Sequence, residues 1–166
     1  VLMTMTGTAQ GMQPLVSWSL GAGRRRDCWR LMRYGAVTAA LFALLSFALG
    51  ELGAPLIVSA FLERDSDIFS YSVSALRAYA CSFLVLGCNI IFAGASTAME
   101  RPGPAFLISV SRSLVLPAAS LLILPALFGD WGIWTAPLVS ELACLVLAAL
   151  CALHWIRQER RSAGGR

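Results

Sequence analysis

Five long apolar segments constrain the fold of this chain more than any other feature of its sequence. They are separated by linkers rich in glycine, proline or charged residues, and they cover residues 1–21, 34–58, 70–98, 105–127 and 133–156. About 20 apolar residues in a helix cross the hydrocarbon of a bilayer, and a helix satisfies its own backbone hydrogen bonds there. The segments therefore predict an all-α integral membrane protein with five transmembrane helices, in contact with the lipid bilayer.

The charge content supports a membrane class and argues against nucleic acid as a partner. Charged residues make up 13% of the chain, whereas soluble domains have about 25%. The net charge of +4 comes from arginine alone, because the sequence has no lysine. These arginines gather at the ends of the apolar segments, so we expect no nucleic-acid binding. The five cysteines form no CxxC pair, and they predict no metal site.

The distribution of arginine predicts how the chain is oriented in the membrane. Five crossings place linker 22–33, turn 100–104 and the tail 157–166 on one side, and these hold ten of the 13 arginines. The opposite side receives loop 61–69 and turn 128–132, with Arg64 alone. Arginine-rich linkers are retained in the cytoplasm. The pattern predicts a multi-pass protein of the plasma (inner) membrane with a cytoplasmic C-terminus.

Three charged residues, Arg77, Arg112 and Glu141, fall well inside the apolar segments. Such charges are costly in hydrocarbon unless they are paired or hydrated. Arg77 and Glu141 have similar expected depths, which allows an ion pair between them. Two interpretations stay open for this intramembrane polar network. The groups either hold the helices together, or they line a path for substrate or protons, with Glu141 as the proton carrier.

Uncharged polar residues in the apolar segments suggest a cleft. Gln13 precedes Pro14 in the first segment, and proline leaves a carbonyl beside it without its helical partner. Trp18 lies one turn further on, and Asn89 lies in the middle of the third segment. Asn89 suits either a hydrogen bond between helices or a contact with a ligand. We predict that these four residues line a substrate cleft.

Four short motifs occur in a fixed order along the chain. They are GMQPLVSWSLGAG at residues 11–23, LR followed by GCN within 76–89, SVSR at 109–112 and PLVSE at 137–141. In this order they resemble the GxQPxxSYNYGAG, LR…GxN, SxxR and PxxS[DE] patterns of the multidrug and toxic compound extrusion (MATE) transporters, nearest their DinF-like and MepA-like bacterial members. Trp18-Ser19-Leu20 replaces the usual Tyr-Asn-Tyr, and Glu141 replaces the commoner aspartate.

The resemblance implies a particular architecture and activity. Such transporters have twelve helices in two lobes, which rock around a central cleft and export cationic or amphipathic compounds in exchange for protons or sodium ions. This chain would supply helices 8–12, so its partners would include the helices of the N-terminal lobe. The fragment alone would be inactive. No cofactor other than the coupling ion, H⁺ or Na⁺, is implied.

Two other function classes were weighed against transport. A non-transporting membrane module, or an orphaned product of a truncated transporter gene, would have the same segments without export activity. A membrane-embedded enzyme has little support, because the sequence contains no HExxH or GxSxG motif. We therefore expect a multidrug efflux transporter and no catalytic residues.

Overall fold

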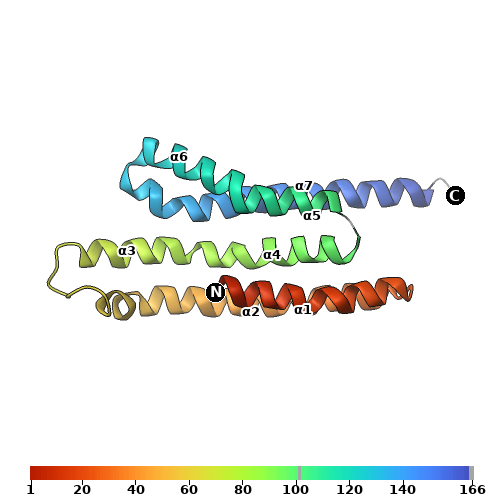
Figure 1. Cartoon of the computed structure of the whole chain (residues 1–166), viewed down its shortest axis with the longest axis horizontal. Coiled ribbons are helices and arrows are strands. Elements are labelled where there is room, and N and C mark those ends of the chain that lie inside the picture. Colours follow the sequence, from red (N-terminus) through yellow and green to blue (C-terminus); the bar gives the residue numbers. More distant parts are fainter. Residues whose placement is uncertain (101, 165–166) are drawn as a thin grey trace.

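The computed structural model is an elongated bundle of helices that lie nearly side by side (Figure 1). It describes residues 1–100 and 102–164, without the side chains of Pro102 and of residues 155–164. In chain order the helices are α1 (Leu2–Gly21), α2 (Arg25–Ser59), α3 (Phe69–Ala80), α4 (Ser82–Ala98), α5 (Pro102–Val110), the π-helix η1 (Ser111–Val115), α6 (Leu116–Phe128) and α7 (Asp130–Gly164).

Successive spans alternate in direction along the bundle. α3 continues into α4 along one line, and α5, η1 and α6 together form the next span (Figure 1). Most connections are short, so neighbours in sequence pack as antiparallel neighbours in space. The exception is the longer loop between α2 and α3, at the end of the bundle opposite the start of α2 (Figure 1).

Four of the spans are long and apolar enough to cross a membrane: residues 25–59, 69–98, 103–128 and 130–154. Much of their apolar surface points away from the bundle, as at Leu52 and Leu122, which are each at least 77% exposed. In water such a surface would drive aggregation, whereas in lipid it is solvated. The predicted fold class, an all-α membrane protein, is confirmed.

Small residues allow α1, α2 and α4 to approach one another closely. Met5, Ala9, Met12 and Val16 form the buried face of α1, at the spacing of successive helical turns. A Cβ atom placed on Gly94 of α4 would lie 3.1 Å from the Cβ of Ala9. In lipid the hydrophobic effect does not drive helices together, so this close van der Waals contact stabilises the trio.

Helix boundaries differ from the predicted segments at both arginine-rich stretches. The predicted linker 22–33 is helical from Arg25 onward, because arginine is a good helix former and Asp27 lies in the first turn, where a carboxylate is favourable. The predicted tail 157–166 continues α7 as far as Gly164, and its side chains lie outside the described residues. The apolar parts of both spans remain where the sequence placed them.

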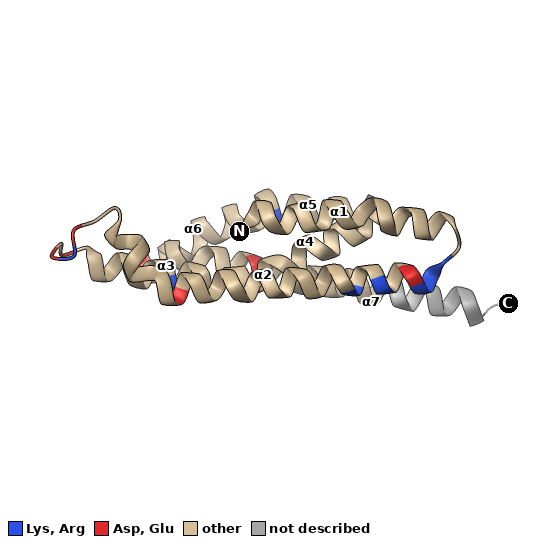
Figure 2. Ribbon diagram, turned by 90° about the horizontal axis from the view of Figure 1, so that it is seen from below, with Lys and Arg blue, Asp and Glu red and all other residues tan. Residues whose placement is uncertain are grey.

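The charged residues separate by sign towards the two ends of the bundle (Figure 2). Arg24, Arg25 and Arg26 lie where α1 meets α2. Glu63, Asp65 and Asp67 lie in the loop between α2 and α3, at the opposite end. The helical part of the chain therefore has one basic end and one acidic end, as the linkers predicted.

The turn between α6 and α7 depends on two glycines. Gly129 has a φ of +60° and a ψ of −144°, a region that only glycine occupies readily. A Cβ atom on Gly132 would clash with the backbone of Leu124. These two positions let α7 turn back and pack along α6.

We expect Gly129→Ala and Gly132→Ala each to lower the free energy of unfolding by about 1–3 kcal/mol, because each forces strain or a backbone shift. Unfolding in detergent with increasing dodecyl sulfate, followed by circular dichroism, measures the effect. Gly11→Ala is the matched control, since a Cβ at Gly11 meets nothing within 4 Å. Equal stability of all three variants would contradict this account of the turn.

Candidate functional site

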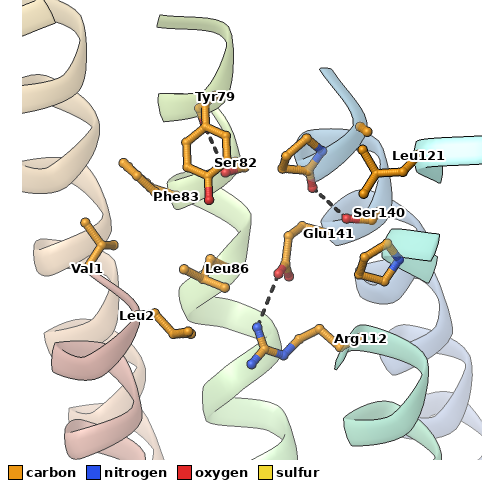
Figure 3. Close-up of a pocket in the computed structure, with 13 residues that line it drawn as sticks. Val1, Leu2, Tyr79, Ser82, Phe83, Leu86, Arg112, Leu121, Ser140 and Glu141 are labelled. Atoms are coloured by element: carbon orange, nitrogen blue, oxygen red, sulfur yellow. Dashed lines mark hydrogen bonds and ion pairs between the residues drawn. The ribbon is translucent and has the colours of Figure 1, made fainter. Parts of the chain in front are cut away.

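A pocket of about 490 Å³ opens between the start of α1, the α3–α4 span and the α6–α7 hairpin (Figure 3). One wall carries Tyr79, Phe83 and Leu86, which are apolar or aromatic, and another carries Arg112 and Glu141. The volume is typical of sites for small molecules. An apolar surface with a few charged groups suits an amphipathic ligand.

Arg112 and Glu141 form an ion pair on the wall of this pocket. Arg112 Nη1 lies 3.2 Å from Glu141 Oε1, and the side chains are 20% and 11% exposed. The two residues come from different elements, η1 and α7 (Figure 3). The pair therefore ties the α5–α6 span to α7 in a largely apolar environment, where each charge needs the other.

Asn89 of α4 completes a cluster of three residues. Its side-chain Nδ2 donates to Glu141 Oε2 over 2.7 Å and to the backbone carbonyl of Glu141 over 2.9 Å. Asn89 is fully buried. Glu141 thus accepts from an amide on one oxygen and from a guanidinium on the other, and the cluster joins α4, η1 and α7.

One atom of the cluster lacks a partner. Asn89 Oδ1 is buried and has no hydrogen bond within the described part of the chain. A buried acceptor without a partner costs about 1–3 kcal/mol, and such groups in native proteins call for an explanation.

The π-helix η1 determines where Arg112 lies. Residues 111–115 make the wider i→i+5 turn, which inserts an extra residue relative to an α-helix and often occurs at functional sites. Pro117 follows within two residues of its end and cannot donate to the preceding turn. The wide turn and the proline set the register in which Arg112 faces α7.

Comparison with known proteins identifies the family. The MatE family model matches residues 1–121, which include α1 to α5, η1 and the start of α6. The chain belongs to the MatE family. A search of curated proteins found no match, and a search of solved structures also found none.

The MatE family consists of membrane transporters, so membership gives the pocket and its cluster a context of transport. It also agrees with a multi-pass membrane protein. Glu141 lies beyond the matched residues, in α7. The structure nevertheless connects it to two matched residues, Asn89 and Arg112.

Arg77 of this MatE chain pairs with Glu51 and not with Glu141. Its Nε lies 3.7 Å from Glu51 Oε2 and donates to the Glu51 carbonyl over 3.2 Å. The Arg77 side chain is 47% exposed, so it does not belong to the buried cluster. The Arg77–Glu141 pair that the sequence allowed is not formed. Glu141 lies level with Asn89, which is about 18 Å from Arg77 along the α3–α4 span at 1.5 Å per residue, so the two charges are at different depths.

The four predicted cleft residues do not come together. Asn89 forms the hydrogen bond between helices that was one of its two interpretations. Gln13 is half-buried, and its amide nitrogen lies 3.5 Å from the point that a Cβ atom on Gly94 would occupy. Pro14 is exposed on α1. Trp18 is exposed, and its ring lies 5.1 Å from the guanidinium carbon of Arg24.

Sequence reasoning missed other parts of the site. Tyr79, Ser82 and Phe83 line the pocket, and Ser82 donates to the Tyr79 carbonyl over 2.7 Å. The boundary between α3 and α4 falls at Cys81, whose backbone angles (φ −56°, ψ −30°) stay helical. No glycine or proline marks the boundary, so the sequence held no signal for it. Among the described residues, no cluster of His, Cys, Asp and Glu could hold a metal ion.

We expect Glu141→Gln to lower the free energy of unfolding by about 2–3 kcal/mol, because it leaves Arg112 largely buried without a counter-charge. Arg112→Gln should have a similar effect, and the double variant Arg112→Gln/Glu141→Gln should recover part of the loss. Arg77→Gln, which breaks the exposed pair, should cost less than about 1 kcal/mol. Unfolding in mixed detergent micelles measures all four. Strict additivity of the two single effects would show that the groups do not interact.

Proposed function

We propose that this MatE chain is part of an efflux transporter, which exports cationic or amphipathic compounds in exchange for protons or sodium ions as two lobes rock around a cleft. The observation that carries the proposal is the position of Glu141. This carboxylate lies on the wall of a pocket, held by Arg112 and Asn89 from two other elements. A charge that joins three helices can respond to an ion and change their packing.

The cluster suggests how an ion could be coupled to movement. With Glu141 charged, its two oxygens accept from Arg112 and from Asn89, and α4, η1 and α7 are held together. A proton or a cation on Glu141 would compete with the Arg112 guanidinium for the same carboxylate. Arg112 would then be free to turn into the pocket, and the helices would favour another packing.

The pocket suggests which compounds are moved. Its aromatic and aliphatic walls, from Tyr79, Phe83 and Leu121, would accept an apolar body. Glu141 would attract a positive group once Arg112 has moved away. A cationic amphipathic compound matches both features, and it would leave when Arg112 returns to Glu141. The substrate and Arg112 would thus bind the Glu141 carboxylate alternately.

We expect Glu141→Gln to slow the efflux of a cationic dye such as ethidium about tenfold, the factor that corresponds to one lost charged contact. Dye retention in cells expressing the full reading frame that contains this chain measures this, with membrane protein quantified by immunoblot. Arg77→Gln is the matched control and should retain wild-type efflux. Adding Gln13→Ala tests the proposed cleft face of α1.

The double variant Arg112→Gln/Glu141→Gln separates function from folding. It should accumulate in the membrane better than Glu141→Gln alone, yet its efflux should stay slow because the carboxylate is missing. Normal export by cells carrying both Gln13→Ala and Glu141→Gln would contradict the site. No export by the wild-type full reading frame would favour the non-transporting membrane module.

We further propose that the arginine-rich end faces the cytoplasm, with the protein in the plasma (inner) membrane. Arg25→Cys lies at that end, and Ser66→Cys lies in the acidic loop. In intact cells a membrane-impermeant maleimide should label Ser66→Cys, whereas Arg25→Cys should react only after permeabilisation. The unmodified chain is the control for its native cysteines. The reverse labelling pattern would contradict the orientation.

A further inference from the structure

A second hollow lies on another part of the bundle, between α2 and α4, and the proposed function does not use it. This α2–α4 groove has a volume of about 630 Å³ and is almost entirely apolar. On α2 it is lined by Trp29, Arg33, Ala36, Ala40 and Ala43, which recur at the spacing of one helix face. We propose that it binds one anionic diacyl phospholipid, with an acyl chain in the groove and the headgroup at Arg33.

The groove is basic at one end and apolar at the other, as a lipid has a charged headgroup and an apolar tail. Arg33 and Trp29 are exposed at the basic end, where Arg30 and Arg26 also lie on α2. Tryptophan prefers the headgroup level, and arginine near a bilayer surface attracts anionic lipids. Beyond Arg33 the lining carries no charged residue, and it ends at Leu44 and Leu84. A headgroup and an acyl chain meet suitable surfaces in that order.

The length of the groove matches one leaflet of a bilayer. On α4 the lining residues run from Leu84 to Ala95, which is about 16 Å at 1.5 Å per residue. Half of a hydrocarbon core of about 30 Å is about 15 Å. A transmembrane helix seated here would need a groove along its whole crossing, and it would cover the exposed guanidinium of Arg33. A lipid in the leaflet at the basic end matches the length of the groove and leaves Arg33 free to bind the headgroup.

Native mass spectrometry of the detergent-solubilised chain tests the proposal. The chain is mixed with equal amounts of phosphatidylglycerol and phosphatidylcholine that have the same acyl chains, and the retained lipids are counted. Phosphatidylglycerol should be preferred, and Arg33→Gln should lower the preference about fivefold, the factor for one arginine near an anionic surface. Arg30→Gln, on the same helix but outside the groove, should change it less than twofold.

A second pair of variants tests the place of the acyl chain. Ala40→Phe fills the groove and should reduce the retention of both lipids, whereas Thr38→Phe adds the same bulk at an exposed position outside the groove and should not. Equal effects of Arg33→Gln and Arg30→Gln would show diffuse attraction and overturn the proposal. So would equal retention by the two phenylalanine variants, or a second protein chain occupying the groove. The readout does not involve export, so the proposal and the transport function can fail separately.

Discussion

The ion pair between Arg112 and Glu141 is the constraint on which the inner packing of this bundle depends. In hydrocarbon neither charge is tolerated alone, so the two side chains have to meet. Their meeting fixes η1 against α7, and the two hydrogen bonds from Asn89 add α4 to the same point. The other ion pair between spans in the described residues, between Arg77 and Glu51, is more exposed.

The rest of the bundle is held by shape. α1, α2 and α4 pack through alanine, glycine and methionine, whose small or flexible side chains allow close contact. Van der Waals packing of this kind makes the helices rigid, but it does not determine which helix faces pack together. The polar cluster does, because its ion pair and hydrogen bonds are directional. The two kinds of contact occupy different parts of the molecule: the shape-based core lies between α1, α2 and α4, and the cluster lies between α4 and the α5–α7 hairpin.

The general class of the fold followed from the sequence, because long apolar runs have few alternatives in lipid. The cost of burying charge also identified Arg112 and Glu141 as residues that need partners. The partners themselves were not predictable. From the sequence, Arg77 and Glu141 had similar expected depths, but Glu141 contacts Asn89, about 18 Å from Arg77 along the α3–α4 span. Only the three-dimensional packing shows that Glu51 is the neighbour of Arg77.

Two local features were hidden for a different reason. The π-helix at residues 111–115 is followed by Pro117, but a proline alone does not specify a wide turn. The boundary at Cys81 has no glycine or proline to mark it. The role of Asn89 was predicted only in part from the sequence. Its polarity marked it as important, but only its contacts decided between a hydrogen bond within the bundle and a surface for ligands. Gln13 and Trp18 remain cleft residues only as a prediction.

The wide turn at η1 has a mechanical consequence. Its extra residue, relative to a regular α-helix, amounts to about 100° of rotation around the helix axis. If that turn tightened to the usual hydrogen-bond pattern, α6 would rotate by this angle relative to α5 and bring a new set of side chains towards α7. The contact between Arg112 and Glu141 is made in the register of the wide turn, so such a rotation would require that contact to break or shift.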